Sequence, residues 1–382
     1  MAAERFWFAS PAREFFGEGV RERYDGPLTP PAVTAARERL APGEVLIGWL
    51  PFEPGGPGAL VRPERLRTGP GAGEPGADPS EPRDPRAGAP GGRVPHESVP
   101  RESYLRAVGR ALERIGAGEL EKVVLARAVE LPARGVDPFA AMREARRRDP
   151  RVHAFAYDTG LADGPEGLFG ASPELLVRRT GPLVASLPLA GSRPRRPEPE
   201  ADRAQALELL ASEKDRTEHA VVVRHIAEVL RGLCARVIVP AEPSLVATET
   251  MWHLASSVQG VLEDPATSVV ELAAALHPTP AICGAPVAAA LAEIRAAEPL
   301  ERGLYAGATG WCDRAGDGEW AVTLRAGQRL GERLLLHAGA GVVAGSEPEA
   351  EWEETAAKLR TMERALGAAD PLETCVSARS VR

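Results

Sequence analysis

The stretch LEKVVLARAV, residues 120–129, predicts a buried β-strand that carries one unexpected charge, Lys122. The chain holds 46 lysine and arginine residues, but only three are lysine: Lys122, Lys214 and Lys358. Arginine stays protonated, whereas a buried lysine can lose its proton and act as a base. Two interpretations follow: Lys122 is a catalytic base, or its long side chain reaches solvent from the strand end.

The composition is that of a soluble globular protein with a large core, since 44% of the 382 residues are hydrophobic and 26% are charged. The net charge of −8, without a long basic run, argues against a nucleic-acid or membrane-surface partner. Four scattered cysteines favour a reducing cytoplasm and neither a disulfide framework nor a zinc site. No run of ~18 apolar residues and no signal-peptide core is present. We therefore expect a cytoplasmic protein.

Apolar periodicity on both sides of the stretch predicts one α+β domain over residues 1–367, with two packed, mainly antiparallel sheets and helices outside. Helices are expected at 30–41, 103–116, 138–148, 202–234, 267–276, 287–298 and 346–367. Strands are expected at 6–11, 45–52, 120–129, 153–158, 167–179, 182–193, 236–240, 253–262, 303–313, 319–330 and 333–343.

Three further local features complete the predicted domain. Ser346 and Glu349 form a capping-box pattern at the start of the last helix, with Pro348 in its first turn. Residues 66–98 are dense in proline, glycine and charge, which predicts a mobile loop. Residues 368–382 predict a disordered tail.

The helices that carry the other two lysines also carry spaced carboxylates. Asp215 and Glu218 share one helix face, and Glu351, Glu354 and Lys358 share another. Each face alone is more typical of a solvated helix surface than of a metal site. If the two faces meet, however, four carboxylates gather and require a cation. Oxygen ligands alone would select Mg²⁺ or Ca²⁺ over zinc.

Two glycine-containing turns and one arginine suggest an anion site. The turns PLAGSR (188–193) and AGAGVV (338–343) expose backbone N–H groups that can cradle a carboxylate. Arg325 lies in the apolar context WAVTLRAG, where an inward guanidinium would need an anion. Plain tight turns and an outward-facing strand arginine are the alternatives.

Two more titratable side chains lie in apolar strands. Glu174 in FGASPELLV would have a raised pKa if buried, and could then donate a proton. His253 in MWHLAS has a similar context. A lone strand histidine is more often a satisfied core residue than a catalyst, so its role stays open at this point.

Taken together, the motifs occur in a recognisable order: KVVLAR, GASPELL, LPLAGSR, LLASEKDRTEH, WHLAS, LHPTPAICG, LYAGATGWCD, TLRAG, AGAGVV and EWEETAAKL. The chain resembles the chorismate-utilising enzymes, and among them the siderophore-type isochorismate synthases. The resemblance extends from the first strand to the last helix and omits only residues 66–98 and the tail. It implies the chorismate-utilising enzyme fold.

The resemblance also implies a reaction. Members that make aminated products lack lysine at the Lys122 position, whereas the water-using members have it. By this resemblance, Lys122 is the general base that activates water for attack at C2 of chorismate. Glu174 is the general acid that protonates the departing C4 hydroxyl. The result is isomerisation of chorismate to isochorismate.

The remaining site residues follow from the same resemblance. Mg²⁺ would be held by Glu218 and Glu354, assisted by Asp215 and Glu351, and would bind the ring carboxylate of chorismate. The enolpyruvyl carboxylate would be bound by Tyr305, Arg325, Gly339 and Gly341. Other active-site positions match Gly191, Ser192, His253, Ala281 and Lys358.

Several alternatives remain open from the sequence. A salicylate synthase would share Lys122 and Glu174 but would go on to eliminate pyruvate. A non-catalytic chorismate-binding protein would be expected to lack one of these two residues. A metal-dependent hydrolase lacks support because no histidine-rich ligand set is present. We expect a monomer, and a pathway that leads to siderophores, salicylate-derived metabolites or menaquinone.

Overall fold

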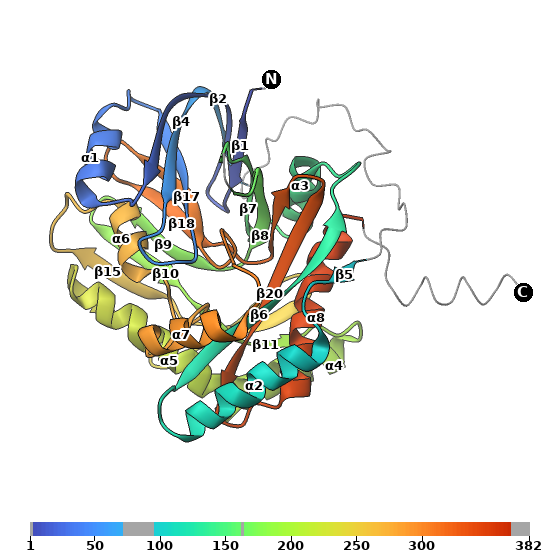
Figure 1. Cartoon of the computed structure of the whole chain (residues 1–382). Coiled ribbons are helices and arrows are strands. Elements are labelled where there is room, and N and C mark those ends of the chain that lie inside the picture. Colours follow the sequence, from blue (N-terminus) through green and yellow to red (C-terminus); the bar gives the residue numbers. More distant parts are fainter. Residues whose placement is uncertain (1–2, 72–94, 162–163, 368–382) are drawn as a thin grey trace, which may run out of the picture.

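The computed structural model describes residues 3–71, 95–161 and 164–367. Its centre is a long antiparallel pair formed by β6 (Lys122–Pro132) and β20 (Arg333–Val343), which crosses the middle of the molecule (Figure 1). The pair is continuous over its whole length, from Val343 opposite Lys122 to Arg333 opposite Pro132. The runs KVVLARAVEL and RLLLHAGAGVV favour this arrangement, because β-branched and other apolar side chains suit a strand buried on both faces.

All paired strands in the described part of the chain are antiparallel, and seventeen of them form one hydrogen-bonded network. A second, three-stranded sheet contains β11, β14 and β13. The other strands are β1 (Arg5–Ala9), β2 (Arg13–Gly26), β3 (Val45–Leu50), β4 (Gly58–Pro70), β5 (His96–Glu97), β7 (His153–Asp158), β8 (Gly167–Ser172), β9 (Leu175–Thr180), β10 (Leu183–Leu187), β11 (Leu189–Pro194), β12 (Cys234–Ile238), β13 (Ser244–Ala247), β14 (Met251–Ala255), β15 (Val258–Leu262), β16 (Gly284–Ala285), β17 (Ala308–Asp313), β18 (Gly318–Val322) and β19 (Ala326–Leu330).

Helices surround these sheets, as predicted (Figure 1). They are α1 (Pro30–Glu38), α2 (Arg101–Gly116), α3 (Pro138–Arg148), α4 (Pro199–Ala211), α5 (Glu213–Arg231), α6 (Val269–Leu276), α7 (Val287–Ala297) and α8 (Pro348–Ala365). Helices α2, α7 and α8 pack against the β6–β20 pair, and α5 packs against β11. The predicted α+β fold with mainly antiparallel sheets and outer helices is therefore confirmed.

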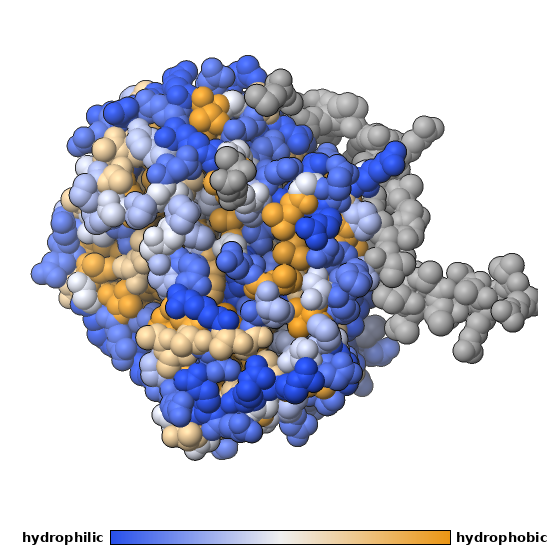
Figure 2. Space-filling model, in the orientation of Figure 1, coloured by the Kyte–Doolittle hydropathy of each residue, from blue (hydrophilic) through white to orange (hydrophobic). Residues whose placement is uncertain are grey.

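The visible surface of the molecule is mainly hydrophilic. On the face shown in Figure 2, hydrophilic side chains predominate and leave only smaller apolar areas between them. None of the helices in the described ranges is long and apolar enough to cross a membrane.

The predicted single helix over 202–234 is wrong, because the chain breaks at Ser212 into α4 and α5. Ser212 has an extended backbone, with φ −68° and ψ 114°, so it ends one helix and begins the next. Its hydroxyl accepts a hydrogen bond from the Asp215 N–H at 3.3 Å, which is the usual action of a serine N-cap. The break orients the start of α5, where Asp215 lies in the first turn and Glu218 in the second.

The capping box predicted at Ser346 is also wrong. Helix α8 begins at Pro348, and Glu347 is its N-cap without a side-chain capping bond. The Ser346 hydroxyl instead accepts a hydrogen bond from the Val343 N–H at 3.1 Å. The serine therefore secures the end of β20, while proline occupies the first helical position as predicted.

The predicted loop over 66–98 is too long at both ends. Residues 66–70 complete β4, which pairs with β2, and His96–Glu97 form β5 beside β6. The interior of the predicted loop, 72–94, lies outside the described residues, as does the predicted tail at 368–382.

A buried ion pair fixes the strand that carries Lys122. Glu298 binds Arg302 at 2.5 Å, with side chains 7% and 2% exposed. Glu298 also accepts the Ala126 N–H at 2.8 Å. Arg302 donates to the carbonyls of Val124 and Ile282, both at 2.7 Å. The pair thus ties β6 to the segment that contains Ile282.

Replacement of Glu298 by alanine should lower the free energy of unfolding by roughly 3–5 kcal/mol, because Arg302 remains buried without its carboxylate. Denaturant unfolding of the purified variant measures this loss. The exposed Glu301→Ala serves as the control and should stay within about 0.5 kcal/mol of the wild type. A loss below about 1 kcal/mol for Glu298→Ala would show that the pair is dispensable.

Candidate active site

A cavity opens beside the β6–β20 pair, with a volume of about 710 Å³ including its mouth. Strands β11, β14 and β20, helices α5 and α8, and the turns around residues 173, 281 and 305 contribute to its wall. Twelve of the fifteen predicted site residues line it: Glu174, Gly191, Ser192, Glu218, His253, Ala281, Tyr305, Arg325, Gly339, Gly341, Glu354 and Lys358. The structure thus brings together residues from most of the predicted motifs.

The other three predicted residues, Lys122, Asp215 and Glu351, lie behind this wall. Asp215 sits beneath Gly191, where a Cβ atom would come within 3.0 Å of the Asp215 Cβ. Gly191 also has φ +75°, a conformation that favours glycine. The glycine in PLAGSR is therefore required by both its conformation and its close approach to α5.

Lys122 is fully buried, with 0% exposure, so the interpretation of a strand-end lysine that reaches solvent is wrong. Its Nζ lies 2.8 Å from Glu218 Oε1. Opposite, a Cβ atom at Gly341 would fall 2.2 Å from the same oxygen and 3.0 Å from Lys122 Cε. Only glycine at position 341 leaves room for this ion pair.

Each of the four carboxylates predicted to bind metal lies beside an amino-acid cation. The pairs are Lys122–Glu218 at 2.8 Å, Lys214–Glu351 at 2.8 Å, Lys358–Glu354 at 2.6 Å and Arg193–Asp215 at 3.5 Å. All three lysines of the chain are used in this way. The predicted meeting of two charged helix faces is therefore observed, with amino-acid cations among the carboxylates.

The negative field of this cluster is strong. Although burial lowers the pKa of Lys214, the carboxylates of Glu351, Glu218 and Glu354 raise it above its ordinary value. Burial and the neighbouring Glu354 together raise the pKa of Glu351. Among the residues that the structure describes, no three acidic, histidine or cysteine side chains converge as a ready metal site.

Glu174 lies between β8 and β9 and not within a strand, contrary to prediction. Its side chain is 2% exposed, and burial raises its pKa to about 8, although a hydrogen bond from the Leu189 backbone and the charges of Lys122 and Lys358 oppose this. The Glu174 N–H donates to Ser172 Oγ at 3.2 Å, which fixes the turn. Glu174 is thus a protonated carboxylic acid at neutral pH.

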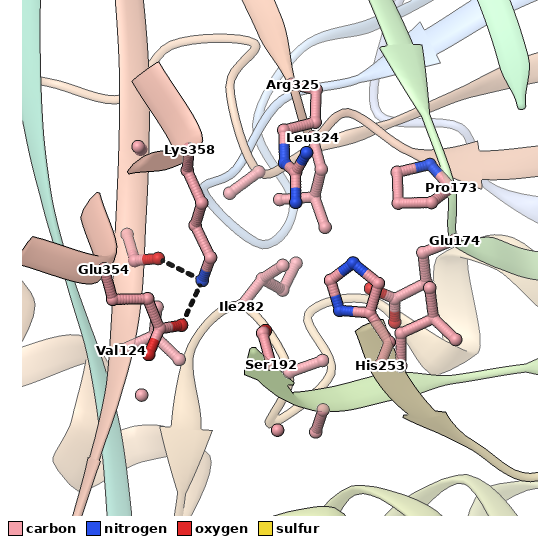
Figure 3. A pocket seen from close by; sticks show the side chains of 18 of the residues that line it. Val124, Pro173, Glu174, Ser192, His253, Ile282, Leu324, Arg325, Glu354 and Lys358 are labelled. Carbon is pink, nitrogen blue, oxygen red and sulfur yellow. Dashed lines mark hydrogen bonds and ion pairs between the residues drawn. The ribbon is translucent and has the colours of Figure 1, made fainter. Parts of the chain in front are cut away.

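Figure 3 shows Glu174 and His253 on one side of the cavity and Glu354 and Lys358 on the other. Burial, Arg325 and Lys358 hold the pKa of His253 well below its usual range, so its imidazole is neutral. One ring nitrogen bonds to the Gly191 backbone, while Nε2 has no partner among the described residues. His253 is therefore not the fully satisfied core histidine considered as its alternative.

Arg325 interrupts the strand predicted over 319–330, because it lies between β18 and β19 with φ +48°. Such a backbone conformation is costly for a residue other than glycine and is often found at functional sites. The guanidinium points into the cavity (Figure 3), and none of the described carboxylates forms an ion pair with it. Burial lowers its pKa to about 10, which still leaves it charged and in need of an anion.

The sequence analysis missed one polar residue of the cavity wall, His337. Its ring stacks on Tyr305 with 4.8 Å between centroids and 11° between planes. His337 precedes Gly339 and Gly341 by two and four positions in β20, so all three face the same side. Strand alternation could therefore have identified it once the two glycines were placed in the site.

Comparison with known proteins identifies the family. The family model described as chorismate binding enzyme matches residues 80–367, three quarters of the chain. The chain belongs to this family.

Several proteins of known sequence or structure resemble the chain over nearly its whole length. Isochorismate synthase DhbC of Bacillus subtilis is 42% identical over 95% of this chain and 93% of its own. Isochorismate synthase EntC of Escherichia coli is 35% identical over 96% of each. A solved structure of DhbC from Bacillus anthracis superposes with a TM-score of 0.87 at 39% identity, covering 96% of this chain and 97% of the other.

The buried acid of this chorismate-binding enzyme should make its stability fall with rising pH. Folded Glu174 keeps its proton up to about pH 8, whereas the unfolded carboxyl releases it near its ordinary value of 4.5. Between these values, the wild type should lose stability relative to Glu174→Gln by up to about 1.4 kcal/mol per pH unit. Urea unfolding from pH 5 to 8 measures the difference. The exposed variant Glu301→Gln is the control. If the free energies of unfolding of the wild type and Glu174→Gln changed in parallel with pH, the assignment of Glu174 as a buried acid would be contradicted.

Proposed function

We propose that the protein is an isochorismate synthase, which moves a hydroxyl group from C4 to C2 of chorismate. The observation that carries this proposal is a protonated glutamic acid in the cavity wall, Glu174, together with a fully buried lysine, Lys122, directly behind the same wall. Two relatives, 42% and 35% identical to this chain, are named isochorismate synthases. The protein would accordingly be an isomerase.

In this proposal, Lys122 is the general base and Glu174 is the general acid. Lys122 acts in its neutral amine form and accepts a proton from the water whose oxygen forms the new bond to C2. The ring double bonds shift, the C4–O bond breaks, and Glu174 gives its proton to the departing hydroxyl, which leaves as water. A general acid works best when its pKa lies near the working pH, and burial brings Glu174 to about 8.

The cavity also suits the two carboxylates of chorismate. Arg325 supplies an unpaired guanidinium, and the Tyr305 hydroxyl lies close to Gly339, whose backbone hydrogen-bonds it. A charged arginine in a buried site gains most from a carboxylate, with which it can form two parallel hydrogen bonds. We assign the enolpyruvyl carboxylate to this end of the cavity.

We propose that a magnesium ion binds at the opposite end. Glu218 and Glu354 both line the cavity, and the field of the carboxylate cluster already stabilises the ammonium group of Lys214. Mg²⁺ usually takes a few carboxylates, several waters and an anionic substrate group. Glu218 and Glu354 would hold it, with Asp215 and Glu351 assisting, and the ion would neutralise the ring carboxylate of chorismate.

The pathway forms part of the proposal. The DhbC structure from Bacillus anthracis, 39% identical to this chain, is described as 2,3-dihydroxybenzoate-specific. We propose that this chain likewise forms isochorismate for a 2,3-dihydroxybenzoate siderophore or a related aryl acid. We propose a cytoplasmic monomer, in agreement with the composition and the scattered cysteines.

Incubation of the protein with chorismate and Mg²⁺ tests the function, with products separated by chromatography. Isochorismate should accumulate without salicylate, and addition of EDTA should stop turnover. Fluorescent salicylate together with pyruvate would instead support the runner-up, a salicylate synthase. Binding of chorismate without any product would support a non-catalytic chorismate-binding protein.

Lys122→Ala should reduce kcat by about 10²–10⁴-fold while KM changes little, because a general base acts in the transition state. Steady-state isochorismate formation measures both constants. Lys122→Gln, which fills more of the buried space, should be equally inactive and controls for lost packing. Activity of either variant near that of the wild type would contradict the base assignment.

A further inference from the structure

His337 forms part of the cavity wall beside Tyr305. It lies in β20 on the same face as Gly339 and Gly341, and its imidazole lies flat against the Tyr305 ring. Tyr305 in turn is close to Arg325, whose charge influences it. His337 is therefore part of the wall that surrounds the unpaired guanidinium.

The imidazole is buried and unsatisfied. Its exposure is 4%, and neither Nδ1 nor Nε2 has a hydrogen-bond partner among the described residues. Buried polar side chains are normally hydrogen-bonded, so an exception on a cavity wall indicates a partner that arrives with the ligand. The stack with Tyr305 uses the ring face and leaves both nitrogen atoms free at the ring edge.

The nearby guanidinium of Arg302 does not supply the missing hydrogen-bond partner of the His337 imidazole. Arg302 is fully engaged with Glu298 and with the carbonyls of Val124 and Ile282. Burial, assisted by Arg302, lowers the pKa of His337 to about 3. The imidazole is therefore neutral at all ordinary pH values, with one N–H to donate and one nitrogen to accept.

We propose that His337 is a further substrate-binding residue, whose neutral imidazole donates its N–H to the carboxylate held by Arg325 and Tyr305. This inference rests on the proposed function and extends it. A neutral donor adds a hydrogen bond to the anion without adding a second buried cation beside Arg325, which would be costly. The stack also holds the Tyr305 ring in the plane that presents its hydroxyl.

Two variants separate the hydrogen bond from the packing. His337→Phe keeps a flat ring against Tyr305 and removes both nitrogens. It should raise KM for chorismate about tenfold, the value of one hydrogen bond, and leave kcat within about twofold. His337→Gln restores an N–H donor without the ring and should bring KM to within about threefold of the wild type.

His153→Phe is the matched control. His153 is also 4% exposed, and both its ring nitrogens also lack partners in the described structure, but it does not line the cavity. Its replacement should leave KM and kcat unchanged. Thermal unfolding of all three variants verifies that each is folded.

An unchanged KM for His337→Phe would overturn the inference, as would a His337→Gln variant as impaired as His337→Phe. Failure of the proposed function would be a different result, since the wild type would then form no isochorismate. In that case, calorimetric titration with chorismate decides the matter, because a tenfold weaker binding by His337→Phe still supports the inference and equal binding refutes it.

Discussion

The ion pair between Lys122 and Glu218 is the constraint on which the rest of the site depends. A fully buried lysine side chain is costly unless a carboxylate lies beside it, and here the Glu218 oxygen is 2.8 Å from the lysine nitrogen. Strand β6 brings the lysine, α5 brings the glutamate, and β20 must carry glycine at 341 to leave room. One pair thus determines how three elements from distant parts of the chain approach one another.

The same principle extends to the whole charged end of the cavity. Four carboxylates would repel one another strongly in a buried cluster, yet each lies beside Lys122, Lys214, Lys358 or Arg193. At the other end, none of the described carboxylates pairs with Arg325, and Tyr305, His337 and Glu174 are uncharged. Among the described residues, the cavity therefore has an acidic end whose charges are paired and a basic end whose charge is not.

The sequence predicted most of the elements and the composition of the site, because long apolar periodic segments and rare lysines are local signals. It failed where a local signal competes with tertiary contacts. Ser212 lies inside a helical pattern, but its side chain caps α5 and breaks the helix. Ser346 resembles a helix cap, but its hydroxyl bonds to Val343. His337 was missed because an apolar strand gives no sign that one of its faces borders a cavity.

The pairing of β6 with β20 also has a consequence for biosynthesis. Lys122 lies opposite Val343, which is close to the other end of the chain. Loop-closure entropy disfavours such distant contacts, and proteins rich in them fold slowly. The catalytic centre consequently cannot form on the ribosome until nearly the whole polypeptide has emerged. Until then, β6 exposes an apolar edge that nascent-chain chaperones would have to shield.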